Sequence, residues 1–285
     1  MSDIAYVNGA YLPLAEAQVS ILDRGFLFAD GVYEVAAVID GRLVDNEAHL
    51  ARLERSLREL QLASPVSMAQ IVEIERELVA RNSVREGLVY LQITRGAAAR
   101  DFSFPEGVPP TLVGFAQKKN ILTAPTAASG VKVVTTPDLR WARRDIKSIA
   151  LLAQVLAKHV ASDAGCQEAW MVDDKGFVTE GSSSTAFIIT KDGVIVTRPN
   201  STDILPGCTR RSVIALAEQQ GLRVEERAFS VAEAHAAAEA FLTSASNLVL
   251  PIVEINGRVI GAGKPGPHAT KLRALYLDFA RATAI

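Results

Sequence analysis

Five short turn sequences, each lying between two runs of strand-forming residues, constrain the fold of this chain more than any other feature. Asn8-Gly9, Asp40-Gly41 and Asn256-Gly257 are dipeptides typical of tight β-hairpins, because their residues accept the left-handed backbone of a type I′ turn. The turn sequences at 173–176 and 191–193 separate two further pairs of strand-like runs. Repeated hairpins favour antiparallel strand pairs over the regular strand–helix–strand alternation of a doubly wound sheet.

Helical periodicity occurs between these hairpins. Leucines at offsets of 3, 7 and 10 from Leu50 predict a helix over residues 47–60, with Asn46 as its N-cap. In the run 148–161, four apolar residues share one helical face that we expect to pack inward: Ile149, Leu152, Leu156 and Val160. Other predicted helices cover residues 67–82, 208–220 and 270–283. Because strands and helices are mixed along the chain, the sequence predicts an α+β fold.

The stretch from 117 to 130 separates two such mixed regions. Its sequence, QKKNILTAPTAASG, is rich in small residues and loses the periodicity of its neighbours, which is typical of a linker. We therefore predict a smaller N-terminal α/β domain at 1–118, a linker at 119–130 and a larger C-terminal domain at 131–285.

Composition excludes several classes of protein. The 285 residues carry a formal net charge of −2, so no nucleic-acid or anionic-membrane partner is expected. Two cysteines, Cys166 and Cys208, provide neither a disulfide framework nor the spacing of a metal site. The N-terminus lacks the features of a signal peptide, and the run 148–161 is too short and too polar to cross a membrane. We therefore expect a cytoplasmic protein without a metal.

Polar residues that can bind an anion occur at three places. Glu180 is followed by serines at 182–184, whose hydroxyl and N–H groups can hold a phosphate. Cys208 and Thr209 lie at the start of a predicted helix, where N–H groups are unpaired. Arg52 is on a helical face and has a guanidinium suited to phosphate. Each has an ordinary alternative: a serine-rich turn, a helix capped by Thr209 and a solvated arginine.

Taken together with Lys147, these residues meet the requirements of a pyridoxal phosphate enzyme. Lys147 lies between a cluster of charges and an apolar run, where a partly desolvated amine becomes nucleophilic. Such an enzyme also needs a carboxylate for the pyridine nitrogen and several donors for the phosphate. The same pattern is open to a simpler reading, in which Lys147 is a surface residue at the beginning of a helix.

The chain resembles class IV aminotransferases, and most closely those of the D-amino acid type. The similarity extends from about residue 6 to residue 275, with the motifs in the order that is found in that family. The segments that carry it are DRGFLFADGVYEV (23–35), HLARL (49–53), LVYLQITRG (88–96), RRDIKSIALLAQVLAK (143–158), GCQEAWMVDDKGFVTEGSSSTAF (165–187), LPGCTRRSVI (205–214) and FLTSASN (241–247). The resemblance implies two mixed α/β domains of the D-amino acid aminotransferase-like fold, with pyridoxal 5′-phosphate as cofactor.

The resemblance also implies roles for individual residues. Lys147 corresponds to the Schiff-base lysine, which moves the proton between substrate Cα and cofactor C4′. Glu180 corresponds to the carboxylate on the pyridine nitrogen, and Arg52 to the phosphate-binding arginine. The other implied cofactor-binding positions are Ser184, Cys208, Thr209, Ser244 and Ala245. The implied substrate-binding positions are Tyr33, Arg100 and Phe102.

Two positions depart from the family pattern. Phe102 stands where the family's carboxylate-binding motif, Arg-x-His, has a histidine, and Asp101 adds a negative charge beside Arg100. Phe102 cannot donate a hydrogen bond, which indicates a more apolar substrate side. Ala245 replaces a threonine, so its backbone N–H remains for the phosphate but a hydroxyl is lost.

The function implied is transamination between a D-amino acid and a 2-oxo acid by a ping-pong cycle, in a homodimer whose site the Arg100 loop completes. Branched-chain L-amino acid aminotransferase, (R)-amine transaminase and aminodeoxychorismate lyase are alternatives of the same fold. A catalytically silent binding module is the alternative from another class. The presence of Lys147, Glu180 and Arg52 together favours an enzyme over that module.

Overall fold

A computed structural model describes residues 3–285, which form two compact units. The first unit consists of the residues up to Asn120, together with Ile146–Ala150 and Ala280–Ile285. The second consists of Ile121–Asp145 and Leu151–Phe279. Two segments that we placed in the C-terminal domain, 146–150 and 280–285, therefore group with the first unit, and the first of them contains Lys147.

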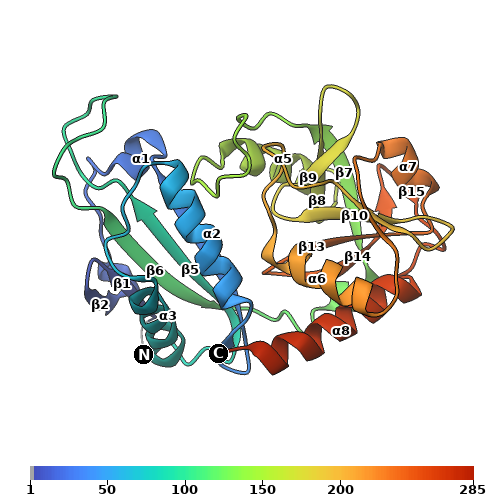
Figure 1. The fold of residues 1–285 in the computed structure, drawn as a ribbon, viewed down its shortest axis with the longest axis horizontal. Coiled ribbons are helices and arrows are strands. Elements are labelled where there is room, and N and C mark those ends of the chain that lie inside the picture. The colour runs from blue at the N-terminus through green and yellow to red at the C-terminus, as the bar shows by residue number, and fades with distance from the viewer. Residues whose placement is uncertain (1–2) are drawn as a thin grey trace. The chain divides into compact units, whose positions relative to one another are not determined.

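The first unit is built on a six-stranded antiparallel sheet in the order β2-β1-β6-β5-β3-β4. Its strands are β1 (Ile4–Val7), β2 (Ala10–Pro13), β3 (Gly31–Ile39), β4 (Arg42–Leu43), β5 (Glu86–Thr94) and β6 (Thr111–Lys118). Its helices are the short 3-10 turn Leu14–Glu16, α1 (Arg24–Phe28), α2 (Asn46–Glu59) and α3 (Met68–Arg81). Helix α2 packs on β3 and α3 on β6, and their leucines and isoleucines fill the core over the sheet (Figure 1).

The turns and helix starts of this unit test the local predictions. The hairpin at Asn8-Gly9 is confirmed, because both residues have positive φ and β1 pairs with β2 across them. The N-cap of α2 is Asp45, so the prediction of Asn46 was wrong by one residue. Helix α3 begins after Ser67, whose side chain accepts from the Gln70 N–H in a capping box.

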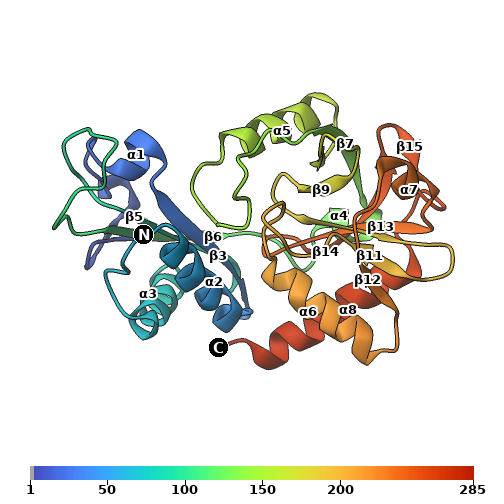
Figure 2. The same ribbon diagram turned by 45° about the horizontal axis from the view of Figure 1, so that its top comes forward.

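The second unit is built on a nine-stranded mixed sheet in the order β12-β11-β10-β13-β14-β7-β8-β9, with β15 paired to β14. Its strands are β7 (Val131–Pro137), β8 (Glu168–Val172), β9 (Val178–Gly181), β10 (Thr185–Ile189), β11 (Ile195–Thr197), β12 (Val224–Glu226), β13 (Glu239–Ser244), β14 (Leu248–Ile255) and β15 (Arg258–Val259). Its helices are α4 (Pro125–Ser129), α5 (Leu152–Asp163), α6 (Cys208–Gln219), α7 (Val231–Ala236) and α8 (Pro267–Thr283), the last of which ends in the first unit. Helix α5 lies on one side of this sheet, and α6 and α8 lie on the other (Figures 1 and 2).

Helix α5 differs from its prediction in both position and packing. It begins at Leu152, so Lys147 lies in an irregular segment before the helix and not at its first turn. Three residues of the apolar face that we expected to pack inward, Leu152, Leu156 and Val160, are instead exposed together with Val155, at between 43% and 72%. The fourth predicted residue, Ile149, precedes the helix, and the residues of α5 that are buried are two alanines. Periodicity therefore placed three of the four residues on one face, but the prediction that this face packs inward was wrong.

Helix α4 lies within the stretch that we predicted as a linker. Across residues 3–285, no helix is both long enough and apolar enough to cross a membrane.

Candidate active site

Lys147 in the first unit lies in an irregular segment beside the start of β3, where the Ser148 N–H donates to the Ile146 carbonyl at 2.8 Å. The Tyr33 N–H donates to the Lys147 carbonyl at 3.0 Å, and the Lys147 N–H donates to Ser56 Oγ at 3.3 Å. Lys147 Nζ lies 4.1 Å from the centre of the Tyr33 ring. Within residues 3–285 this amine forms no hydrogen bond or ion pair. An amine that rests on an aromatic ring without a carboxylate partner remains available to react.

Arg52 is held by Glu34, a buried carboxylate on β3. Arg52 Nε donates to Glu34 Oε1 at 2.7 Å and Arg52 Nη2 donates to Oε2 at 2.8 Å, while His49 Nδ1 lies 2.9 Å from Oε2. Burial opposes ionisation of Glu34, but the charge and hydrogen bonds of Arg52, with those of His49, lower the pKa of that carboxyl well below its usual range. Glu34 therefore orients the guanidinium. Sequence reasoning did not single it out, although it directly follows Tyr33.

Two phenylalanine rings lie near the Arg100 guanidinium. The Arg100 guanidinium lies 5.3 Å from the centre of the Phe28 ring and 5.7 Å from that of Phe102, and within residues 3–285 it has no carboxylate partner. The Asp101 carboxylate instead accepts from the Ser103 N–H at 2.7 Å, which lowers the pKa of Asp101. Phe102 is exposed. The negative charge that we expected beside Arg100 is therefore turned toward Ser103.

Glu180 in the second unit is buried and is held by Arg140. One guanidinium joins Glu180 to Asp138, because Arg140 donates to both carboxylates. The Leu205 N–H donates to Glu180 Oε1 at 3.1 Å. Burial raises the pKa of the Glu180 carboxyl, and the Arg140 charge opposes that rise. Arg140 was missed from the sequence because it lies 40 residues before Glu180 and no local pattern marks it.

Three segments of the second unit meet at one edge of its sheet. The first residue of β10, Thr185, pairs with Thr243 near the end of β13. A Cβ at Gly207, the residue before α6, would lie 2.9 Å from Thr185 Oγ1. The segment that leads into α6 is also tied to Glu180 through the Leu205 N–H. The end of β9, the start of α6 and the β13–β14 turn, with its Ser244 and Ala245, are thereby brought together.

The start of α6 lacks a capping side chain. Its N-cap is Gly207, whose lack of a side chain leaves the first turn without a side-chain acceptor, and Thr209 is already the second helical residue. The alternative of a helix capped by Thr209 is therefore wrong. Nearby on β13, Thr243 Oγ1 is buried and has no hydrogen-bond partner among the described residues. N–H groups at an uncapped helix start can bind an anion.

The serines at 182–184 are arranged differently from our expectation. All three hydroxyls donate to one buried carboxylate, that of Glu168, and Ser184 Oγ does so at 2.9 Å. The anion that these hydroxyls hold is therefore part of the chain itself. Glu168 was missed because it precedes the serines by 14 to 16 residues, on the neighbouring strand β8.

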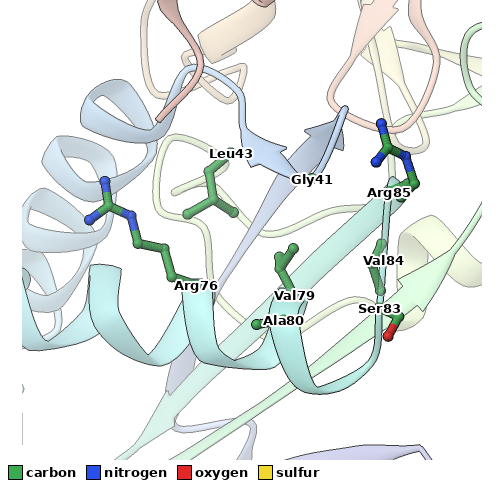
Figure 3. A pocket seen from close by; sticks show the side chains of 8 residues that line it. All are labelled: Gly41, Leu43, Arg76, Val79, Ala80, Ser83, Val84 and Arg85. Carbon is green, nitrogen blue, oxygen red and sulfur yellow. The ribbon is translucent and has the colours of Figure 1, made fainter.

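A hollow of about 250 Å³ in the first unit lies apart from these residues (Figure 3). Its lining is mainly apolar but includes Ser83, and Arg76 and Arg85 extend from opposite ends in Figure 3. None of its lining residues is a candidate site residue, so it has no part in this site.

The sequence profile of the family described as amino-transferase class IV matches residues 31–255. This chain belongs to that family. D-alanine aminotransferase of Bacillus licheniformis is 40% identical over 263 residues, which cover 91% of each chain. D-alanine aminotransferase of Staphylococcus epidermidis (strain ATCC 12228 / FDA PCI 1200) is 36% identical over 282 residues, covering 98% of this chain and 99% of the relative. Among solved structures, a T.th. branched-chain amino acid aminotransferase with pyridoxamine 5′-phosphate superimposes with a TM-score of 0.92 at 27% identity, covering 99% of this chain and 95% of the other.

Each unit of this class IV aminotransferase, taken by itself, carries groups of the kinds that pyridoxal phosphate requires. The first unit offers the unpaired amine of Lys147 and the oriented guanidinium of Arg52. The second unit offers the buried carboxylate of Glu180, the uncapped start of α6 and the unpartnered hydroxyl of Thr243. An amine, a carboxylate and a set of phosphate donors are the groups that this cofactor requires.

Proposed function

We propose that this protein is a pyridoxal-phosphate-dependent transaminase that moves the amino group of a D-alanine-like D-amino acid to a 2-oxo acid. The observation that carries the proposal is the Lys147 amine, which rests 4.1 Å from the centre of the Tyr33 ring without a carboxylate partner among residues 3–285. A lysine amine that is not engaged in an ion pair with a carboxylate is available to form a Schiff base. The D-amino acid assignment is supported by relatives named D-alanine aminotransferase at 40% and 36% identity, against 27% for the branched-chain structure.

Each residue of the site has a distinct role in this scheme. Bound pyridoxal phosphate supplies an electron sink for the substrate Cα. Lys147 Nζ would hold the cofactor covalently and would move the proton between the substrate Cα and the cofactor C4′. Glu180 would keep the pyridine nitrogen protonated. The phosphate would be bound by Arg52 and by the backbone and side-chain groups of Cys208, Thr209, Ser244 and Ala245, while Ser184 would line the cofactor.

The substrate carboxylate is assigned to Tyr33 and Arg100. The Arg100 guanidinium has no carboxylate partner among the described residues, so its donors remain available. The rings of Phe28 and Phe102 lie beside this arginine, and Phe102 is exposed to solvent. We expect the apolar ring at position 102 to favour substrates with apolar side chains.

A substrate panel tests the function directly. D-alanine, L-leucine and (R)-1-phenylethylamine are each assayed with pyruvate and with 2-oxoglutarate as amino acceptor. D-alanine with 2-oxoglutarate should be the fastest pair. A D-alanine rate no higher than that of L-leucine would favour a branched-chain L-aminotransferase, and a higher rate with the amine would favour an amine transaminase. Transamination of none of the three amino donors would favour the lyase, whose substrate must carry a leaving group that these donors lack.

Substitution of Lys147 tests the mechanism. Lys147→Ala should lose turnover and the visible absorption of bound cofactor, because no other residue is proposed to hold it covalently. Lys175→Ala, at an exposed turn of the second unit, is the matched control and should keep both. Full activity in Lys147→Ala would refute the assignment. Protein that gains no visible absorption with added pyridoxal phosphate would favour the silent binding module.

We also propose a homodimer, supported by the exposed apolar face of α5. Four large aliphatic side chains on one water-exposed helix face are typical of an interaction site. In a two-fold dimer the same patch on each copy is covered by the other. Light scattering should give the mass of two chains, and a fully active monomer would contradict the proposal. Within residues 3–285, Cys166 and Cys208 form no disulfide, which supports a cytoplasmic location.

A further inference from the structure

Glu168, the first residue of β8, is a buried carboxylate with an unusual set of donors. Its side chain accepts hydrogen bonds from the hydroxyls of Ser182, Ser183 and Ser184 and from the Ala169 N–H. The Ser183 and Ser184 bonds measure 3.1 and 2.9 Å, and both end on Oε2. Glu168 is 2% exposed. Four donors on one buried carboxylate satisfy nearly all of its acceptor sites.

These bonds fix the direction of each serine hydroxyl. A hydroxyl has one proton to donate, and all three protons point to Glu168. Toward a ligand the three serines can therefore only accept. The remaining cation nearby is Lys158, whose Nζ lies 3.7 Å from Glu168 Oε1 but is half exposed. An exposed ion pair contributes little to stability. The neutral hydrogen-bond donors therefore supply most of the stabilisation of the Glu168 carboxylate.

The loop that Glu168 holds lies between two parts of the proposed cofactor site. It directly follows Glu180 and ends at Thr185, which packs against Gly207 at the start of α6. The Gly181 N–H donates to the Ser184 carbonyl at 2.7 Å, which closes the loop tightly. A Cβ at Gly181 would lie 2.1 Å from Ser184 Oγ, so a larger residue there would displace the hydroxyl that donates to Glu168.

We propose that Glu168 is a positioning residue that holds the 181–184 loop, and through it sets both Glu180 and the start of α6 for the cofactor; this rests on the proposed function. Glu168 does not contact the cofactor in this scheme. It acts by orienting three hydroxyls and the backbone between them. Loss of its second acceptor oxygen should therefore loosen the loop without removing any group that binds the cofactor.

Glu168→Gln tests the proposal with little change of shape. The amide keeps one acceptor oxygen and replaces the other with a donor nitrogen, so at least one serine must reverse its hydroxyl. We expect pyridoxal phosphate to bind about tenfold more weakly, measured by fluorescence titration of the apo-protein. The pH midpoint of the bound cofactor's visible absorption should also move. Glu254→Gln is the matched control, because this carboxylate lies in the same sheet and pairs with Lys132 at 3.2 Å; it should leave both readouts unchanged.

Ser183→Ala provides a second variant that removes one donor and keeps the carboxylate. It should weaken cofactor binding by about threefold, and it decides the question if Glu168→Gln does not fold. Suppose that the parent protein binds the cofactor normally while both variants show unchanged affinity and an unchanged absorption midpoint. That result would overturn the positioning role of Glu168 but not the proposed function. Parent protein that takes up no pyridoxal phosphate would overturn the proposed function and this inference with it.

Discussion

Glu75→Gln removes a buried carboxyl that lacks a positively charged hydrogen-bond partner. Glu75 lies in α3, where its Oε2 accepts from Asn46 Nδ2 at 2.6 Å. Burial raises the pKa of Glu75 from 4.5 to about 7; the Asn46 hydrogen bond and the His49 charge oppose this rise, and the Glu34 charge adds to it. Asn46 Oδ1 has no hydrogen-bond partner among the described residues. A glutamine keeps the shape of Glu75, and its Nε2 can donate to that oxygen.

The raised pKa makes the contribution of Glu75 depend on pH. Between pH 4.5 and about 7 the folded protein holds the Glu75 proton and the unfolded chain does not. The folded state binds more protons there, so stability falls as the pH rises through this window. At about 1.4 kcal/mol for each pH unit from 4.5 to about 7, the ionised carboxyl lowers the free energy of unfolding by about 3 kcal/mol at pH 8. Glu75→Gln avoids this loss.

Thermal unfolding followed by circular dichroism at pH 5 and pH 8 measures the effect. Each kcal/mol shifts the midpoint by about 2–4 °C in chains of this size, so Glu75→Gln should unfold about 6–12 °C above the parent at pH 8. At pH 5 the difference should be small. Glu77→Gln on the same helix is the control, since its exposed pair with Arg81 contributes about 0.5 kcal/mol at either pH. An equal gain at both pH values, or a loss at pH 8, would refute the reasoning.

Two further predictions concern the second unit. Arg140→Ala leaves the buried carboxylates of Asp138 and Glu180 without their shared guanidinium, so urea denaturation should show a loss of about 3–5 kcal/mol; a loss below about 1 kcal/mol would contradict the pairing. Gly207→Ala places a Cβ 2.9 Å from Thr185 Oγ1 and must displace the start of α6. It should weaken pyridoxal phosphate binding in a fluorescence titration, and parent-like affinity would show that α6 starts independently of Thr185.

Local signals in the sequence predicted the hairpins, because a type I′ turn depends on two residues. Asn8 and Asn256 both have positive φ, and each is followed by a glycine that also does. The α+β class followed from such turns together with helical periodicity. The position of Lys147 did not follow, because the apolar run after Ser148 is periodic whether or not its first turn is helical. Hydrogen bonds with Tyr33 and Ser56, both distant in sequence, hold Lys147 in the segment before the helix.

The partners of the buried carboxylates could not be predicted, because each lies on another element. Glu34 meets Arg52 across 18 residues, and Glu180 meets Arg140 across 40. A serine-rich turn looks like a phosphate loop in sequence, but whether its hydroxyls face a ligand or a carboxylate depends on strand pairing. Here the pairing of β8 with β9 brings Glu168 under the loop.

The proton affinities of the buried glutamates follow from the donors that each receives. Glu34 accepts two guanidinium bonds, and its pKa is lowered. Glu75 accepts one neutral amide, and burial raises its pKa to about 7. Glu180 shares the guanidinium of Arg140 with Asp138. The effect of burial on Glu180 therefore exceeds that of the Arg140 charge, and the pKa of Glu180 is raised. A carboxylate that is more basic than usual forms a stronger hydrogen bond to a protonated pyridine nitrogen. Sharing Arg140 between two carboxylates therefore suits Glu180 to its proposed role better than an exclusive arginine would.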